Sequence, residues 1–224
     1  MTNEQISKRL DEVFSQYENS QFRDIVNRRW VFCNNEKKTD ADLLFVGINP
    51  SYIEGKVYVP IYNIEDAVKG YKRYYGVFKN LAEDVSNNWA YMDLFYFRET
   101  EQKKIDEIMS QEKGVAFICN QLQLSFDILQ VIAPKVIVVC NKRIHDFWGK
   151  NRTTDNRNVW MGFKFKDTEN GDVKTIIGVD SDFITPNKLK ADWNPKIVFS
   201  RHLSRTKKEL RDSLKEIIKY ALKS

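Results

Sequence analysis

The chain has 224 residues, which predicts a single domain, and its hydrophobic fraction of 42% excludes a wholly disordered protein. The 36 Lys and Arg residues exceed the 31 Asp and Glu residues by 5, a charge that favours a nucleic-acid partner only slightly. Three widely spaced cysteines exclude a disulfide scaffold and a CxxC metal site. The first residues do not resemble a signal peptide, and no apolar run approaches the ~20 residues of a membrane span. We therefore expect a soluble, cytoplasmic protein.

Apolar spacing and breaker residues predict alternating helices and strands. Helical segments show apolar residues every three or four positions, and strand segments are short apolar runs that end near Gly or Pro. In chain order we expect a helix over 3–17, a second helix and a connection to about 38, a strand over 42–47, a helix over 67–85, a strand over 89–96, a helix over 114–132, a strand over 135–140, two β-type runs near 160–165 and 173–179, a strand over 196–200, and a final helix.

Two local signals are more specific than the general pattern. Asn170 and Gly171 lie between the two β-type runs, and this pair is typical of a hairpin turn. Thr206 precedes Glu209 by three positions, which predicts a capping box at the start of the final helix.

The alternation of strands and helices predicts an α/β fold. We expect a three-layer α/β/α sandwich with a central, mainly parallel sheet of about four strands and a β-hairpin insertion. The whole chain, 1–224, is expected to form one domain, with residues 1–40 as an N-terminal helical extension and residues 155–180 as the hairpin insertion. Ligands of such folds bind at the carboxyl ends of the strands.

The end of the first strand carries the first candidate residue. Gly47 permits a tight turn and Pro50 stiffens the exit, so that Asn49 projects between them. The alternative is that Asn49 only stabilises the turn through an Asx hydrogen bond. The following loop, 50–66, is long enough to suggest a function, and its tyrosines are either binding residues or plain packing residues.

The end of the last strand carries the second candidate. His202 lies between Arg201 and Arg205, just before a helix, although a lone histidine in a loop is more often an ordinary surface residue. The first and last strands can place Asn49 and His202 on one rim. An Asn and a His facing each other near arginines would stabilise an anion.

These residues resemble a known family. The segment Leu44-Phe-Val-Gly-Ile-Asn-Pro-Ser51 looks like the first motif of the uracil-DNA glycosylase superfamily, especially its mismatch-specific branch. Residues 91–98 and 134–140 look like the second and third strands of that family, and His202-Leu-Ser204 is similar to its final motif. The resemblance spans about residues 40–222, but only the first motif is specific.

The chain departs from the family pattern at several positions. No proline follows His202, and Asn141 stands where the family has glycine. Asp93 replaces an asparagine that reads uracil, and an ionised carboxylate accepts hydrogen bonds but donates none. Asp93 is alternatively a strand-end residue with a structural partner. The absence of a four-cysteine cluster excludes the iron–sulfur branches.

The resemblance implies a DNA glycosylase of base-excision repair that flips a deaminated or mismatched base, uracil or a relative, into a pocket. Asn49 would position the attacking water, and His202 would donate a hydrogen bond to the departing base. We expect neither a metal nor another cofactor, and we expect DNA, single- or double-stranded, as the partner of a monomer that binds no membrane. The base-binding candidates are Gly47, Ile48, Tyr52, Tyr58, Asp93 and Asn141; the DNA-backbone candidates are Ser51, Ser200, Arg201, Ser204, Arg205 and Lys207.

Two other functions remain open. The protein is alternatively a catalytically weak or inactive nucleic-acid-binding module with a glycosylase fold, since fold does not fix function. It is also alternatively a hydrolase of free nucleosides or nucleotides. Binding to DNA weakens steeply with salt, whereas binding of a nucleoside does not.

Overall fold

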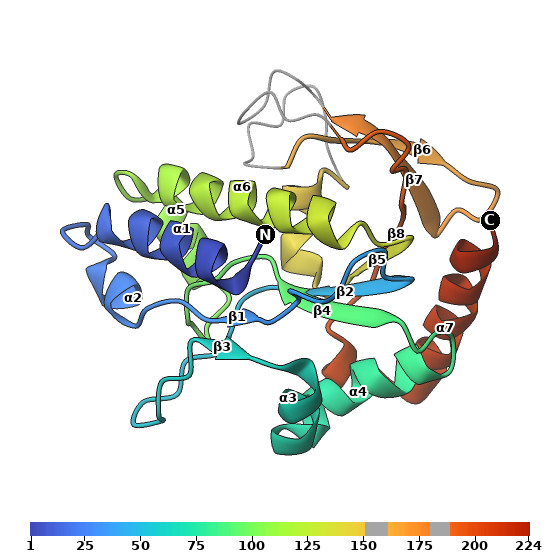
Figure 1. The fold of residues 1–224 in the computed structure, drawn as a ribbon, viewed down its shortest axis with the longest axis horizontal. Coiled ribbons are helices and arrows are strands. Elements are labelled where there is room, and N and C mark those ends of the chain that lie inside the picture. Colours follow the sequence, from blue (N-terminus) through green and yellow to red (C-terminus); the bar gives the residue numbers. More distant parts are fainter. Residues whose placement is uncertain (151–160, 180–188) are drawn as a thin grey trace.

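A central sheet of six strands organises the computed structural model, which describes residues 1–150, 161–179 and 189–224 (Figure 1). Four neighbouring strands run parallel, and the last two are antiparallel. Across the sheet the strands are β4 (Trp89–Asp93), β2 (Leu43–Gly47), β5 (Val136–Val139), β8 (Lys196–Phe199), β7 (Val173–Val179) and β6 (Phe163–Asp167). The predicted α/β class and the mainly parallel sheet are confirmed.

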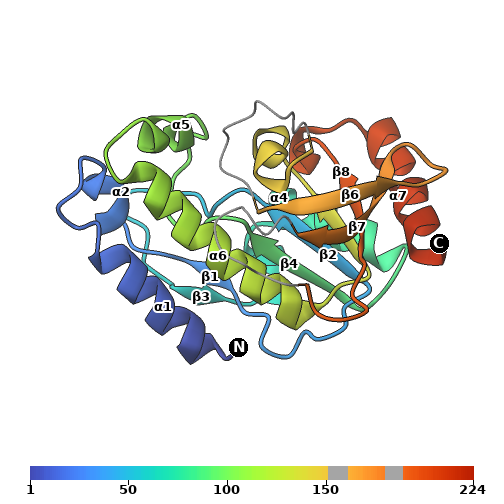
Figure 2. The same ribbon diagram turned by 90° about the horizontal axis from the view of Figure 1, so that it is seen from above.

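Helices lie on both faces of this sheet, as Figure 2 shows. One apolar cluster packs the first face against α1 (Asn3–Ser15), α2 (Arg23–Asn27), α5 (Lys104–Met109) and α6 (Gly114–Ile132). A second cluster packs the other face against α3 (Ile64–Gly70), α4 (Lys72–Glu83) and α7 (Lys208–Lys223). Because both faces are covered, β2 and β5 are buried along their whole length.

The predicted hairpin is present, but it continues the main sheet instead of standing apart as an insertion. β7 pairs with β8, so the hairpin extends the four parallel strands to six. Its turn is closed by the side chain of Asn170, which accepts from the backbone N–H of Asp172 at 3.0 Å. Residues 155–160 and 180 of the predicted segment lie outside the described residues.

Helix boundaries differ from the prediction at three places. The helix expected over 67–85 is two helices, α3 and α4, because the backbone of Tyr71 (φ −130°, ψ 53°) breaks it. The second N-terminal helix is only the short α2, and the connection after it contains β1 (Phe32–Cys33), which pairs with β3 (Ile61–Tyr62). The capping box at Thr206 is wrong, because α7 begins at Lys208 without a side-chain cap.

The helix α6 has the length and apolar composition of a membrane-spanning segment, contrary to the expectation that no run approaches one. Its 19 residues pack between the sheet and α1, however, and its apolar side chains belong to the first core cluster. Its hydrophobicity is therefore that of a central helix in a folded core.

Three short 3₁₀ segments complete the edge at which the parallel strands end. They are η1 (Lys142–Ile144) and η2 (Asp146–Trp148) after β5, and η3 (Leu203–Arg205) after β8. η3 packs against α4, which brings the chain after the last strand next to the helix before β4.

Candidate functional site

The carboxyl ends of the four parallel strands meet at one edge of the sheet, because the strands are in register there. Gly47 of β2 pairs with Asp93 of β4, and Val139 of β5 pairs with Val46 on one side and Phe199 on the other. The loops after these strands therefore leave from the same edge. The candidates Asn49, Asp93, Asn141 and His202 all lie at the strand ends or in these loops.

Asn49 is half-buried just beyond β2, and its amide nitrogen faces backbone carbonyls. Nδ2 donates to the carbonyl oxygens of Glu99 at 2.6 Å, Pro50 at 3.0 Å and Phe97 at 3.4 Å. These bonds fasten the loop after β2 to the segment after β4. Oδ1 accepts no hydrogen bond from the described residues, so it is the atom of Asn49 that is left to hold a water. The neighbouring Ile48 points into the first core cluster and is buried.

The tyrosines of the loop after β2 pack against arginines. The guanidinium of Arg28 lies 4.3 Å from the ring centre of Tyr52, and that of Arg98 lies 5.2 Å from it. Tyr58 also contacts Arg98, at 5.3 Å, and its hydroxyl donates to the carbonyl of Trp30 at 2.7 Å. Both rings therefore already have cation–π partners, which fits the packing interpretation of this loop better than a free stacking surface.

Glu99, in the segment after β4, is a buried carboxylate with several hydrogen-bond donors. It accepts from Arg28 at 2.6 Å and from the backbone N–H groups of Thr100 and Glu101 at 2.6 and 2.9 Å. Burial alone would raise the pKa of Glu99, but the backbone hydrogen bonds and Arg28 outweigh it and lower the pKa. Glu99 is therefore ionised at neutral pH.

Asp93, at the end of β4, is the centre of a buried hydrogen-bond network. Its Oδ1 accepts from Tyr91 at 2.8 Å and its Oδ2 from Tyr62 at 3.4 Å. Two tyrosines of α4 extend these bonds: the Tyr74 hydroxyl lies 3.3 Å from that of Tyr91, and the Tyr75 hydroxyl lies 3.4 Å from that of Tyr62. We call these five residues the Asp93 network.

Burial raises the pKa of Asp93 to about 7, although the hydrogen bonds from Tyr91 and Tyr62 act to lower it. No lysine or arginine contributes to this shift. A carboxyl that titrates near neutral pH at the carboxyl end of a parallel sheet is a candidate functional group. Sequence reasoning named Asp93 but missed the tyrosines of α4 and β4; the alternation of Tyr91 and Asp93 on one strand face was the available signal.

Position 47 has no room for a side chain, because the Asp93 network lies very close to β2 there. A Cβ atom at position 47 would lie 2.2 Å from the Tyr91 hydroxyl and 2.4 Å from Oδ1 of Asp93. Both distances are far below any van der Waals contact, so a side chain here would displace the bond between Tyr91 and Asp93. The structure thus gives Gly47 a role in shaping the site.

Asn141 lies directly beyond β5 and is 5% exposed. Its side-chain oxygen accepts from the backbone N–H of Arg143 at 3.0 Å and so caps η1. Its Nδ2 is buried and has no hydrogen-bond partner among the described residues. A buried donor without an acceptor is costly, so this amide is a candidate donor to a ligand or an ordered water.

His202 is half-buried and precedes η3. Its Nδ1 lies 3.1 Å from the hydroxyl of Ser204, and its ring packs on that of Tyr74 with the ring centres 5.7 Å apart. Burial, followed by the charge of Arg205, lowers the pKa of His202, so its ring is neutral at neutral pH. If Ser204 donates to Nδ1, the ring proton lies on Nε2, which is then a hydrogen-bond donor.

Exposed cations lie near this histidine in the chain and on the helix that packs against η3. The predicted backbone contacts Arg201, Arg205 and Lys207 are exposed, as is Ser51, whereas Ser200 and Ser204 are half-buried. The first turn of α4 adds exposed cations that sequence reasoning missed, because it required the packing of α4 on η3. None of them forms an ion pair within the described part of the chain. We call this set the basic rim: Lys72, Arg73, Arg201, Arg205, Lys207 and Lys208.

The second histidine, His145, was not a predicted site residue and has a structural position. It is buried against Phe199, and its Nε2 lies 2.9 Å from the carbonyl oxygen of Ser200. Burial lowers the pKa of His145 to about 4, so the ring stays neutral while it holds the chain at the end of β8.

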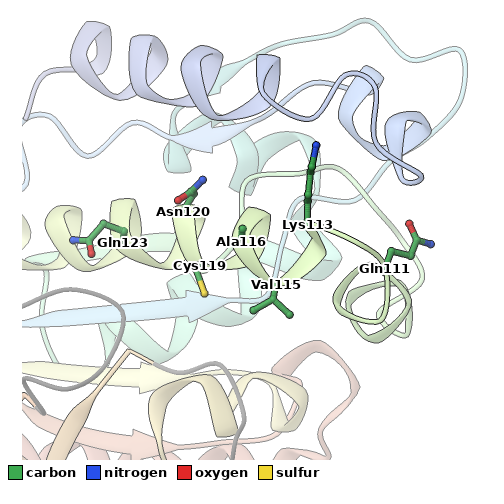
Figure 3. A pocket seen from close by; sticks show the side chains of 7 residues that line it. All are labelled: Gln111, Lys113, Val115, Ala116, Cys119, Asn120 and Gln123. Atoms are coloured by element: carbon green, nitrogen blue, oxygen red, sulfur yellow. The ribbon is translucent and has the colours of Figure 1, made fainter.

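A hollow of about 600 Å³ lies on α6, on the opposite face of the sheet from the Asp93 network. Figure 3 shows its lining side chains on the segment before that helix and along its first half. It contains no acidic residue and no histidine, and the described residues hold no cluster of His, Cys, Asp and Glu suited to a metal. The lining residues are Gln111, Lys113, Val115, Ala116, Cys119, Asn120 and Gln123.

The predicted residues thus form two groups at one edge of the sheet. Asn49 and Tyr52 lie with Glu99 and Arg28, whereas Asp93 and His202 are linked through Tyr74. Neither a scan against protein-family models nor a search of the curated proteins finds a match for this chain.

Proposed function

We propose that this protein is a DNA glycosylase that hydrolyses the N-glycosidic bond of a flipped deaminated or mismatched base. The observation that carries the proposal is the register of the four parallel strands, which gathers Asn49, Asp93, Asn141 and His202 at one edge. The first motif, Gly47-Ile-Asn-Pro50, supports it independently through its resemblance to the uracil-DNA glycosylase superfamily.

The arrangement of the helices supports a three-layer α/β/α sandwich for this enzyme. One core cluster lies on each face of the sheet, and each is closed by its own helices. We assign the protein to the cytoplasm as a monomer without a cofactor, and to base-excision repair as its process.

The proposed reaction uses the two candidate catalytic residues in different ways. Oδ1 of Asn49 holds a water, whose oxygen adds to C1′ of the sugar as the bond from C1′ to the base nitrogen breaks. The bonding electrons leave with the base as an anion, and Nε2–H of neutral His202 donates a hydrogen bond to it. The proton that the attacking water loses passes to solvent, from which the released base anion takes up one proton. Because the transition state is oxocarbenium-like, the main contribution of the site is electrostatic.

The basic rim supports DNA as the substrate. Its six cations are exposed and without ion pairs among the described residues, so they are available to neutralise phosphates. Arg201 and Arg205 flank His202 in the chain, and Lys72 and Arg73 begin the helix that packs on η3. The flipped nucleotide is proposed to enter here. When one nucleotide enters such a site, the phosphates on either side of it stay at the protein surface, where these cations can bind them.

The test is base excision from labelled oligonucleotides that carry one uracil, hypoxanthine, xanthine or mismatched thymine, with strand cleavage by alkali as the readout. We expect the wild type to release at least one of these bases. His202→Ala should lower the single-turnover rate about 100-fold while leaving DNA affinity nearly unchanged, because its hydrogen bond strengthens only as the base departs.

Asn49→Ala is a weaker test on its own, since it also removes the bonds to the carbonyls of Glu99, Pro50 and Phe97. His202→Ala is therefore the primary variant.

The paired variant Lys8→Ala/Lys37→Ala, at exposed lysines outside the basic rim, is the control for Arg201→Ala/Arg205→Ala. Only the latter should weaken DNA binding and reduce its salt dependence, by about one unit of slope for each phosphate that is no longer neutralised. Release of no base by a folded wild type would overturn the proposal.

A nucleic-acid-binding module without hydrolysis is the second candidate, and one observation favours it. The amide nitrogen of Asn49 is already committed to backbone carbonyls, which gives this residue a structural role that needs no catalysis. Steeply salt-dependent DNA binding without release of any base would assign this function instead.

A further inference from the structure

One loop of the protein keeps apolar side chains in contact with water. In the segment between β2 and β3, Ile53, Val57 and Val59 are 45%, 87% and 54% exposed. Figure 1 shows this segment as a loop that projects from the body of the protein beside β3. Single exposed apolar residues are common, but three in one projecting loop form a patch, and such patches mark contact surfaces. We call these three residues the apolar tip.

The loop holds the apolar tip outward because both of its sides are fastened to the protein. On one side, the carbonyl of Tyr52 accepts from the hydroxyl of Thr100 at 2.7 Å. On the other side, the hydroxyl of Tyr58 donates to the carbonyl of Trp30 at 2.7 Å. Between these anchors the chain turns at Gly55, whose φ of 75° lies in the left-handed region that glycine adopts without strain. The exposure of the apolar tip is therefore built into the loop.

Cations lie beside the apolar tip. The ammonium of Lys56, within the loop, lies 4.6 Å from the ring centre of Tyr71 and donates to the hydroxyl of Tyr71 at 3.0 Å. Tyr71 is itself 51% exposed, and it directly precedes Lys72 and Arg73 of the basic rim. The loop and the basic rim therefore meet at Tyr71. Glu54 is the only acid in the loop.

A surface that combines apolar side chains with cations matches unpaired nucleotides better than a duplex. In a single strand the apolar faces of the bases are open to packing, and the phosphates lie beside them. In a duplex the bases are stacked on one another and the phosphates face outward, so only the cations would make contacts. The apolar tip leaves water only against the unpaired bases, and that burial is favourable for both partners.

We propose that the apolar tip and Tyr71 bind the bases of single-stranded DNA, and that Lys56, Lys72 and Arg73 bind its phosphates. The loop follows Asn49 directly after β2, so it leaves from the edge of the sheet that carries the candidate site. A target base in a single strand has no partner to lose before it turns into a pocket, which lowers the cost of extruding it. The choice of DNA, and the presence of a target base in it, rest on the proposed function.

The experiment measures the affinity of the protein for three undamaged fluorescent probes of equal length, by anisotropy titration at two salt concentrations. The probes are a single strand of mixed sequence, the same strand in a duplex, and a single strand of abasic tetrahydrofuran nucleotides, which keeps the charge of the first probe but has no bases. We expect the mixed strand to bind more tightly than the duplex and about tenfold more tightly than the abasic strand, because only it offers open base faces.

Three variants separate base contacts from phosphate contacts. Val57→Ser/Val59→Ser should remove most of the preference over the abasic strand and leave the salt dependence of binding unchanged. Lys72→Ala/Arg73→Ala should reduce the salt dependence for both single strands and keep the preference for bases. Ile177→Ser is the matched control, because Ile177 is an exposed aliphatic residue of β7 outside this surface, and it should behave as the wild type. All these side chains are exposed, so the substitutions leave the folded core intact.

Equal binding of the mixed and abasic strands, or an unchanged preference in Val57→Ser/Val59→Ser, would overturn the inference, as would binding to none of the probes. Tighter binding of the duplex would overturn it too; a duplex affinity that falls in Val57→Ser/Val59→Ser would then assign the apolar tip to insertion between paired bases. Because the probes carry no damaged base, the readout is independent of base release. Preference for the mixed strand without excision from any substrate would leave this inference standing and refute only the glycosylase, and excision with equal binding of the probes would do the reverse.

Discussion

Asp93 and Glu99 are two buried acids at the same edge of the sheet, six positions apart in the chain, and their environments differ in one respect. Glu99 has a guanidinium and two backbone N–H groups against its carboxylate, whereas Asp93 has only phenol hydroxyls. The pKa of Glu99 is lowered, and that of Asp93 is raised to about 7. Burial acts upward on both, so the partners decide the direction.

Glu99 therefore stabilises the fold through its charge, whereas Asp93 can gain or lose a proton in the folded protein. Glu99 ties the segment after β4 to α2 through Arg28, and its charge is needed for that bond. Asp93 sits in a network that is satisfied in either protonation state, because phenols both donate and accept. The candidate for function is therefore the acid without a cation.

Among the changes that test this comparison, Glu99→Gln is expected to have the largest effect, a loss of stability. It leaves Arg28 without its carboxylate, so the free energy of unfolding should fall by about 4 kcal/mol at pH 7. Because the folded-state pKa of Glu99 is lowered, the stabilisation exists above its ordinary pKa and disappears as the pH falls through the folded value. Urea denaturation at several pH values measures this. Glu83→Gln, in an exposed pair with Lys79, is the control and should cost less than about 0.5 kcal/mol.

Asp93→Asn should instead stabilise the folded protein. A shift from 3.8 to about 7 corresponds to about 4 kcal/mol against folding with Asp93 ionised, of which we expect the amide to recover about 2 kcal/mol at pH 8. The advantage of the variant should grow from pH 4 to pH 7 and stay constant above, since the folded wild type binds the extra proton in that window. A variant that is less stable than the wild type at pH 8 would contradict the raised pKa.

Gly47→Ala should disturb the Asp93 network from the side of β2. Its Cβ would overlap the Tyr91 hydroxyl and Oδ1 of Asp93, so the two must move apart, at a cost of about 2 kcal/mol in unfolding free energy. Gly178→Ala, where nothing lies within 4 Å of the added atom, is the matched strand control. Equal thermal stability of the two variants would show that Gly47 is not constrained by the network.

The smallest effect is expected from Tyr91→Phe. It removes one hydrogen bond that favours the ionised carboxyl, so the pKa of Asp93 should rise by about one further unit. Carbon-13 NMR of the aspartate side chains follows this titration directly, with Asp93→Asn identifying the resonance. Tyr96→Phe should leave the pKa unchanged, because the hydroxyl of Tyr96 bonds to Ser125 instead. A fall in the pKa on losing Tyr91 would rule out our assignment of donor and acceptor.

The strands of the parallel sheet were predictable because their local signals agree with their tertiary roles. Continuous apolar runs such as 43–47 and 136–139 bury both faces, and Gly or Pro marks their limits. The division of α3 from α4 was not predictable, since apolar spacing continues through Tyr71 while the backbone breaks there. The capping box at Thr206 failed because that hydroxyl donates instead to the carbonyl of His202.

The sequence by itself determined the class of fold, the order of its main strands and the places of Asn49 and His202 at strand ends, because these depend on local periodicity and on breaker residues. Asp93 is a candidate through the resemblance to a known family and not through such a pattern. Only the tertiary structure decided what those residues do together. The tyrosines Tyr62, Tyr74 and Tyr75 come from segments before β4, and only packing on one face of the sheet brings their hydroxyls to Asp93. The pKa of Asp93 follows from that packing, since desolvation and the absence of a cation are properties of the folded surroundings and not of the residue.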